Sequence, residues 1–257
     1  MLLKPVYTFV AAAVIGIASS ALAKEDVFGN SAQYDACMKR AGGAISLHEC
    51  TDHEFDRLNG VLNGVYMRLL ETSVPPAAGA LLKAERIWID YRDAECEFVS
   101  AYEQNGLGIG LWADIYRGCR MEMTASRARQ FAGSAQTPLN YHSPAFDKCR
   151  SERLNDVAAC VNAEAAQLDN VLNGAYRSLL GASAKRGDEI WRKWYADSVR
   201  KSERAWLKYR DAECAWMQSR EVEPSGLQVS AGDTCRLLLL ANRIQELLEE
   251  QSKITEP

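Results

Sequence analysis

A twelve-residue segment occurs twice in this chain, and the repeat constrains the fold more than any other feature of the sequence. Residues 85–96 read ERIWIDYRDAEC and residues 203–214 read ERAWLKYRDAEC, so nine of the twelve positions agree. Agreement of this length, with Trp, Tyr and Cys among the identities, indicates internal duplication. Placed on a helix, Trp88, Tyr91 and Glu95 of the first copy fall on one face.

Apolar residues in the first half recur at the helical period of 3.6 residues, and no long segment alternates as a β-strand does. Thr51 and Glu54 resemble a capping box, which predicts the start of the second helix near residue 49. A Pro-Pro pair at 75–76 then separates the second helix from the third. The predicted helices of this half are a short one over 31–41 and long ones over about 49–73, 75–102 and 112–131.

The second half repeats this plan with an insertion. The apolar face of its second helix matches the first half at an offset of 110 residues, whereas the dodecapeptide matches at an offset of 118. We place the extra residues within 184–201, which predicts a third helix longer by about two turns, or roughly 12 Å. The fold class is therefore all-α, with two tandem disulfide-stapled helical modules, each of three long helices plus one short helix. The expected boundaries are a signal peptide over 1–23, module 1 over 24–132, a linker over 133–144 and module 2 over 145–252.

The first 23 residues have the pattern of a secretory signal peptide. Lys4 supplies the positive end, residues 9–18 are apolar, and Ala21-Leu22-Ala23 is a small-x-small cleavage site. The apolar run is too short to cross a bilayer, and no later stretch has the roughly 20 apolar residues that a membrane span needs. We therefore expect a periplasmic or secreted protein with no membrane span.

The chain is mildly acidic, with 30 Lys and Arg against 34 Asp and Glu and a formal net charge of −4 at pH 7. Lys4 is the only charged residue of the signal peptide, so its removal makes the mature chain more negative by one charge. Nucleic acid and anionic lipid both require clustered Lys and Arg, and we expect neither as a partner. The charge balance suits a basic partner.

The cysteines are divided equally between the two halves and recur in the same order. They are Cys37, Cys50, Cys96, Cys119, Cys149, Cys160, Cys214 and Cys235. In an exported chain an even, duplicated set indicates disulfides. Each neighbouring pair brackets a short turn or loop, so we favour local pairing, first with second and third with fourth in each module. Long-range pairing is the alternative, and bridges over such loops contribute roughly 2–4 kcal/mol each.

The aromatic residues of the repeat allow two interpretations. Trp88 and Trp206, with Tyr91 and Tyr209 one turn later, either fill the core of each module or form an aromatic platform for a sugar or a partner protein. The core is the simpler interpretation, because large aromatic rings at helical spacing contribute strongly to core packing.

Each copy of the repeat also contains an Arg-Asp pair, Arg92-Asp93 and Arg210-Asp211. Adjacent helical residues point about 100° apart and do not face each other. We therefore expect each of these side chains to find its own partner, either in the scaffold or in a bound molecule.

Asn63 and Asn173 lie in the middle of the second helix of their modules, each directly before a glycine. Both residue types have poor helix propensity, so some other interaction must compensate. We expect a close helix crossing at Gly64 and Gly174, with the asparagine amide bonded across it.

No pattern typical of catalysis or metal binding stands out. His48, His53 and His142 do not recur between the halves, and His48 and His53 lack the i, i+4 spacing of a zinc helix. Nucleophile-elbow, phosphate-loop and dinucleotide motifs are absent from the sequence. We therefore expect no enzyme activity, no metal and no cofactor. A cell-wall hydrolase remains an alternative, since any two carboxylates can meet in space.

Taken together, these motifs resemble the LprI-like lysozyme-inhibitor family of bacterial envelope proteins. The first copy carries Leu62-Asn63-x-x-Tyr66, Trp88-x-x-Tyr91-Arg92-Asp93-Ala94-x-Cys96 and Cys119 followed by Thr124 and Arg127. The second carries Leu172-Asn173-x-x-Tyr176, Trp206-x-x-Tyr209-Arg210-Asp211-Ala212-x-Cys214 and Cys235 followed by Arg243, with Leu240 in place of the threonine. The matched residues are mainly structural, so the motif does not identify the partner-binding residues.

The resemblance implies inhibition of lysozyme and protection of peptidoglycan. A c-type lysozyme is the favoured partner because that class is strongly basic and opposite charge speeds encounter. An inhibitor of this kind would block the cleft with a loop, and residues 105–110 and 221–233 are the candidates. The alternative is a non-catalytic envelope adaptor that binds a protein or cell-wall fragment, for which we expect an exposed apolar groove using Trp191, Trp194 or Trp216.

Overall fold

The computed structural model describes residues 27–101, 109–133, 143–152, 157–220 and 229–255. Every regular element in these ranges is an α-helix, so the predicted all-α class is confirmed. The first module contains α1 (Ala32–Arg40), α2 (Ala44–Thr72), α3 (Pro75–Ala101) and α4 (Ile109–Phe131). The second contains α5 (Pro144–Glu152), α6 (Val157–Ser183), α7 (Glu189–Ser219) and α8 (Ala231–Thr255). Each module thus has three long helices and one short one, as predicted.

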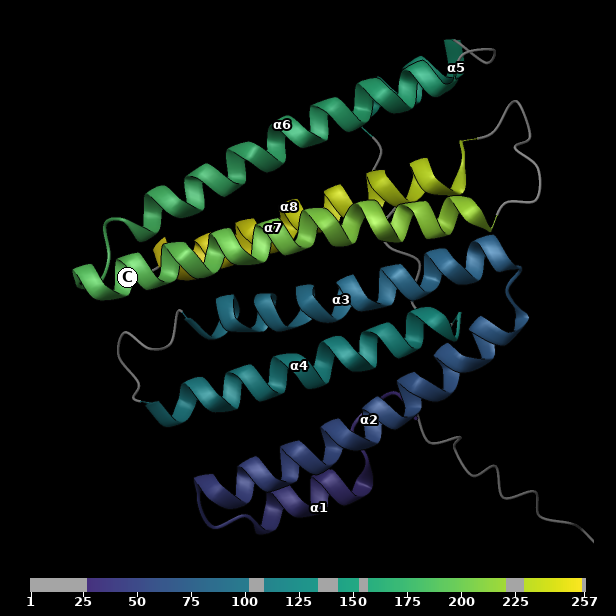
Figure 1. The fold of residues 1–257 in the computed structure, drawn as a ribbon. Helices are drawn as coiled ribbons and strands as arrows, with labels where there is room; N and C mark the ends of the chain where they lie inside the picture. The colour runs from purple at the N-terminus through teal and green to yellow at the C-terminus, as the bar shows by residue number, and fades with distance from the viewer. Residues whose placement is uncertain (1–26, 102–108, 134–142, 153–156, 221–228, 256–257) are drawn as a thin grey trace, which may run out of the picture.

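The two modules meet along α3 and α7, which run antiparallel at the centre of the molecule (Figure 1). On one side α4 packs against both α3 and α2, and on the other α8 packs against both α7 and α6. The rings of Tyr91 and Tyr209 stack at the middle of the α3–α7 pair, with centroids 5.2 Å apart. These tyrosines occupy equivalent positions of the repeat, so an approximate two-fold axis passes between them.

A large hydrophobic core extends through both modules, and a smaller cluster that includes Leu81 and Trp216 also joins them. Leu62 and Phe98 of the first module belong to the same buried cluster as Leu172, Tyr195 and Leu240 of the second. The Phe98 and Tyr195 rings meet edge to face across the junction, 5.7 Å apart. Burying a side chain of this size contributes about 1.5–3 kcal/mol, so the shared core is a substantial part of the stability of each half.

The start of α2 differs from the prediction. The helix begins at Ala44, so Thr51 lies inside it and its hydroxyl donates to the Leu47 carbonyl oxygen, 3.0 Å away. Glu54 caps a different helix, because its carboxylate accepts from the backbone N–H and the hydroxyl of Ser31, the N-cap of α1. The prediction that Thr51 and Glu54 form a capping box was therefore wrong. Glu54 instead joins α1 to α2 through its hydrogen bonds to Ser31.

The insertion in the second module lengthens α7 less than predicted. This helix has 31 residues and α3 has 27, so it is longer by about one turn, not two. The remaining residues form the turn between α6 and α7, where Gly187 has φ of 69°. A left-handed φ of this size favours glycine. Asp188 then starts α7 by accepting from the Trp191 backbone N–H.

The cysteines pair locally, as expected. Two bridges join the short helix of each module to its second helix, and two join the third helix to the fourth. The pairs are Cys37–Cys50, Cys96–Cys119, Cys149–Cys160 and Cys214–Cys235. The predicted signal peptide and most of the predicted linker lie outside the described residues. Within the described ranges, no helix is both long enough and apolar enough to cross a membrane.

Candidate functional site at the module junction

A buried arginine of the first module joins the two modules through carboxylates. Arg127 on α4 is 2% exposed and packs over the Phe131 ring. Its Nε donates to Glu85 of its own module at 3.0 Å. Its two terminal nitrogens donate to both carboxylate oxygens of Glu213 on α7, at 2.8 and 2.9 Å. This bidentate contact is the strong geometry for an arginine–carboxylate pair.

The second module repeats the arrangement around Arg243 on α8, which is 1% exposed. Its Nε donates to Glu203 of its own module at 3.0 Å, and Nη1 donates to Glu95 of the first module at 2.9 Å. Ser202 accepts from Nη2 and also contacts Glu95. Each module therefore supplies an arginine that holds one glutamate of its own and one of the other module, and we call these two networks the junction clusters.

The two junction clusters differ at one equivalent position. Gln130 of the first module donates to Glu213 at 2.7 Å, while Glu246 of the second accepts from Arg243 at 2.9 Å. The Arg243 cluster thus contains three carboxylates for one guanidinium. Counting both clusters, two buried arginines face five carboxylates, so the formal charge of the two clusters is negative when all five are ionised.

The pKa directions follow from this crowding. Burial raises the pKa of Glu85 and of Glu203, although their arginine partners act to lower it. Burial raises the pKa of Tyr209 as well, and nearby Glu213 adds to the shift. Removing charged groups from water disfavours their ionised form, which is the common cause of these shifts.

A pocket of about 240 Å³ opens over the junction between α4 and α8. Edges of four aromatic rings line it, from the Trp and the Tyr of each repeat copy. Ser126, Gln130, Asn242 and Glu246 stand exposed around it. Glu246 shares Arg243 with two other glutamates, and an aromatic ring face beside such a carboxylate favours a cation, because both attract positive charge.

The repeated aromatic residues are almost completely buried. Trp88 and Trp206 are 4% and 2% exposed, and Tyr91 and Tyr209 are each 6% exposed. The core interpretation therefore fits these four residues, which belong to the buried cluster that extends through both modules. No broad exposed platform exists at these positions.

The Arg-Asp pairs correct one prediction. Arg92 and Asp93 do bond to each other, at 2.9 Å from Nε to Oδ1, and Arg210 bonds to Asp211 in the same way at 2.9 Å. The expectation that neighbours could not pair was wrong, because the arginine side chain is long enough to reach the carboxylate of the next residue.

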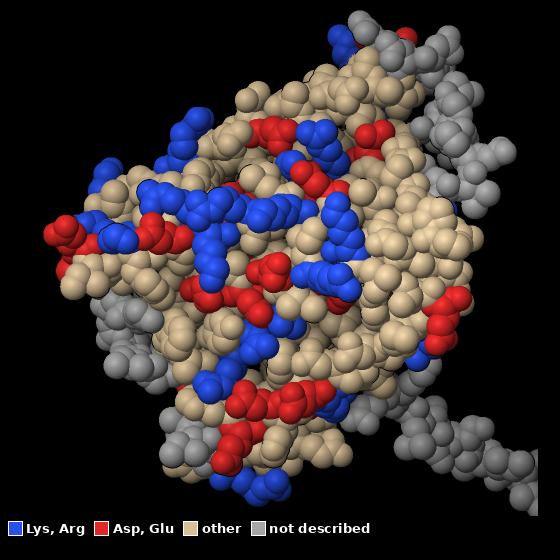
Figure 2. Space-filling model, in the orientation of Figure 1, with Lys and Arg blue, Asp and Glu red and all other residues tan. Residues whose placement is uncertain are grey.

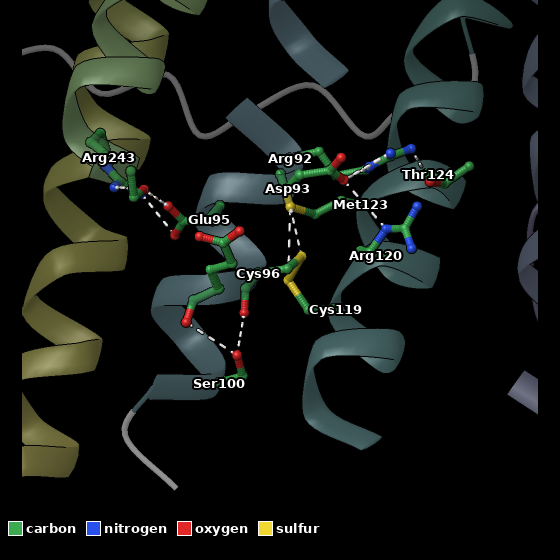
Figure 3. The surroundings of a disulfide bond; sticks show 12 residues. Arg92, Asp93, Glu95, Cys96, Ser100, Cys119, Arg120, Met123, Thr124 and Arg243 are labelled. Atoms are coloured by element: carbon green, nitrogen blue, oxygen red, sulfur yellow. Dashed lines mark hydrogen bonds and ion pairs between the residues drawn. A yellow bond between two sulfur atoms is a disulfide. The ribbon is translucent and has the colours of Figure 1, made fainter. Parts of the chain in front are cut away.

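These pairs also help to attach the helices of each module. Figure 3 shows Asp93 between Arg92 and Arg120, beside the Cys96–Cys119 bridge that joins α3 to α4. Glu95 points from the same helix toward Arg243, on the opposite side from Asp93. One helix thus uses neighbouring motif residues to hold α4 on one side and the second module on the other.

The predicted helix crossing at the asparagines is also wrong. Both Asn63 and Asn173 are exposed, and the Asn173 amide donates along its own helix to the Asp169 carbonyl oxygen. A Cβ atom added at Gly174 would meet nothing within 4 Å, and one at Gly64 would meet only an arginine side chain at 3.7 Å. Packing therefore does not explain why these polar residues recur.

Other predicted features lie apart from the junction. His48 contacts Asp114 at 2.6 Å, and the described part of the chain holds no group of three metal-ligating side chains. Trp191 and Trp216 are buried and Trp194 is half-buried, so these residues do not form the exposed groove expected of an adaptor. The candidate inhibitory loops lie largely outside the described residues.

Sequence reasoning missed the role of the junction glutamates. Glu85, Glu95, Glu203 and Glu213 are identical between the repeat copies, and this identity was the available signal. Their pairing across the junction depends on how α3 and α7 dock, which the helical period of one module does not specify.

The fold and the junction define a class of protein, a covalent pseudo-dimer of two disulfide-bonded helical modules joined by buried ion pairs. The family model described as "Lysozyme inhibitor LprI" matches twice, over residues 37–131 and 147–247. The chain therefore belongs to the LprI lysozyme-inhibitor family, as the motifs indicated.

Two other proteins are similar to this chain. An uncharacterized protein of Rhizobium meliloti (strain 1021) is 25% identical over 114 residues, which cover 39% of this chain and 80% of that protein. A crystal structure of an uncharacterized protein from Burkholderia thailandensis superposes with a TM-score of 0.51 at 18% identity, covering 85% of this chain and 94% of that one. At this identity the second likeness concerns the fold alone.

Proposed function

We propose that this protein is an exported inhibitor of lysozyme that acts in the periplasm or after secretion and protects peptidoglycan. The observation that carries the proposal is the match of both halves to a lysozyme-inhibitor family. Four disulfides support a location outside the cytoplasm, where such bonds persist. A c-type lysozyme is the favoured target because the protein is acidic and that class is basic.

The junction pocket supports a specific mode of contact. A Lys or Arg side chain of the enzyme would enter between α4 and α8, with its charge near Glu246 and its stem against the aromatic edges. Exposed Glu122 on α4 and Glu249 on α8 lie one turn from pocket-lining residues and extend the negative rim. Inhibition would then follow from covering the basic surface around the substrate cleft.

The test is lysis of a cell-wall substrate by a c-type lysozyme, with the oxidised mature protein added at low and at physiological salt. We expect dose-dependent protection that weakens with salt, because screening reduces attraction between exposed charges. The double variant E246K/E249K should raise the concentration needed for half-protection by at least about tenfold, equivalent to roughly 1.4 kcal/mol.

A matched control is D56K/E71K, which reverses two exposed charges on α2 away from the junction. It should protect as the unmodified chain does. Equal loss in both double variants would show that only net charge matters and would refute the pocket contact. No protection by the folded, disulfide-bonded protein would exclude c-type lysozyme and favour the adaptor.

A further inference from the structure

In the second module, the Leu-Asn-x-x-Tyr motif lines a groove between α6 and α7 that shares only Glu203 with the junction clusters. In the second module Leu172, Asn173 and Tyr176 of α6 line this groove, and Arg204 and Leu207 of α7 stand opposite. No helix crossing compensates for the poor propensity of the exposed Asn-Gly pair, so the Asn173 side chain is free of a packing role and faces the groove.

The groove has a volume of about 280 Å³ and combines apolar and hydrogen-bonding walls. Leu172 and Leu207 form the apolar part. The Asn173 amide uses one N–H for the Asp169 carbonyl oxygen, which leaves its other N–H and its oxygen for a ligand. Tyr176 adds a phenol, so both donors and acceptors converge on the space.

The charges of the groove leave a cation uncompensated. Its two carboxylates are already occupied, Asp169 by Arg210 and Arg236 and Glu203 by the buried Arg243. Arg204 is exposed and has no hydrogen bond or ion pair to any residue that the structure describes.

A second guanidinium adds to this positive charge. Arg200 lies one turn from Arg204 on the same wall, and among the described residues it pairs only with Asp197, which also pairs with Lys193. Figure 2 shows Lys and Arg side chains in a row along α7 on the side toward α6. The groove therefore attracts an anion, although the protein as a whole is acidic.

We propose that the α6–α7 groove binds the terminal carboxylate of a short peptide with small apolar side chains. Arg204 holds the carboxylate, with Arg200 adjacent, since a guanidinium matches the planar carboxylate in geometry and charge. Asn173 and Tyr176 bond the preceding peptide group, and Leu172 and Leu207 contact the aliphatic side chain. Such a peptide end occurs on free peptides, on protein termini and on cell-wall stem peptides, which share this chemistry.

The first module provides an internal comparison. It repeats Asn63, Tyr66 and Arg86 but has Leu82 where the second module has Arg200, and Asn59 where it has Asp169. We assign the carboxylate site to the second module, because only there do two guanidinium groups line one wall.

The probe is acetyl-Ala-Ala with a free carboxylate, compared with acetyl-Ala-Ala amide, titrated into the isotopically labelled full-length mature protein. We expect the acid to shift the NMR signals of the Asn173 side-chain amide and the Leu172 and Leu207 methyl groups, and the amide to bind at least about tenfold more weakly. Equal affinity for the two peptides, or shifts confined to other regions, would overturn the proposal.

Arg204→Gln should weaken binding of the acid at least about tenfold and leave the amide unchanged, whereas Lys148→Gln, the same charge change on a 74% exposed side chain of α5, should have little effect. An R204Q protein that is folded and still binds the acid normally would refute the site. R204Q should also inhibit lysozyme normally, because the junction pocket lies between α4 and α8, so the two proposals fail independently.

Co-sedimentation with purified peptidoglycan separates the possible sources. Binding to the wall that acetyl-Ala-Ala displaces and R204Q abolishes would identify stem peptides as the ligand. Binding of the soluble acid without retention on the wall would identify a free peptide or a protein terminus.

Discussion

Among single residues, Arg243 joins three carboxylates at the module junction. It is the partner of Glu95, Glu203 and Glu246, and it also lies 5.8 Å from the Tyr91 ring. Removing one partner of a buried ion pair leaves its charges in a medium of low polarity, which costs more than the pair itself contributes.

Arg243→Ala should therefore lower the free energy of unfolding by about 3–5 kcal/mol. Urea unfolding followed by far-UV circular dichroism measures this change. Arg236→Ala is the control, because that side chain is 44% exposed and its ion pair with Asp169 is worth at most about 1 kcal/mol. Similar losses in both variants would contradict the importance of burial at the junction.

Glu246 should make stability depend on pH. Burial raises its pKa from 4.5 to about 7, with Glu95 adding to the shift and Arg243 opposing it. The folded protein then binds this proton more tightly than the unfolded chain does. The resulting contribution of Glu246 to the free energy of unfolding is complete below about pH 4.5 and is lost as pH rises through about 7. Because the side chain is 47% exposed, water screens the effect and we expect a modest slope.

Glu246→Gln should flatten this decline, which thermal unfolding between pH 4.5 and 8 would detect. The variant restores the residue type of Gln130, so its side chain suits the equivalent position. Glu122→Gln removes a charge from the exposed surface of α4 and should leave the pH profile unchanged. A Glu246→Gln protein with the same profile as the unmodified chain would disprove this assignment.

At the scale of helices, sequence patterns predicted the elements better than their connections. The 3.6-residue period and the Pro-Pro pair located α3 almost to the residue, because both act locally. The start of α2 was misplaced because Glu54 serves Ser31, a partner 23 residues away. A glutamate that bonds a distant residue can occur at the same Thr-x-x-Glu spacing as one in a capping box. Only the folded structure distinguishes the two cases.

The same division between local and long-range interactions applies to the candidate site. Duplication identified Trp88, Tyr91 and the disulfides, which the chain needs in both copies. The contacts of Glu95 with the second module were not predictable, because the docking of α3 on α7 depends on the shape of two complete surfaces. Asn173 and Gly174 were recognised as unusual residues for the middle of a helix. The predicted helix crossing was the wrong explanation for them.

At the scale of the whole molecule, the modules depend on each other. The central pair α3 and α7 buries Phe98, Tyr91 and Glu95 of the first module against the second. Separated from its partner, the first module would expose these apolar side chains, and a contiguous exposed apolar patch favours association.

The segment 24–140 produced alone should therefore form a symmetric dimer. Glu95 of each copy would take the place of Glu213 opposite the Arg127 of the other copy, so the junction clusters would form again. Sedimentation equilibrium should give twice the monomer mass, and Glu95→Lys should prevent association whereas Glu71→Lys, on the exposed surface of α2, should not. A stable, monodisperse monomer would contradict the shared core.

The difference between Gln130 and Glu246, which occupy equivalent positions, bears on how a tandem protein can evolve. In a dimer of identical chains, any substitution beside the two-fold axis occurs in both subunits. Its effect on the stability of the junction is therefore doubled. When the two modules are fused in one chain, a substitution changes only one of the two junction clusters. One cluster can then acquire a new charge, as at Glu246, while the other keeps a neutral residue, as at Gln130. The two junction clusters of the tandem chain can therefore diverge through single substitutions. In a symmetric dimer of identical chains, a single substitution always changes both clusters.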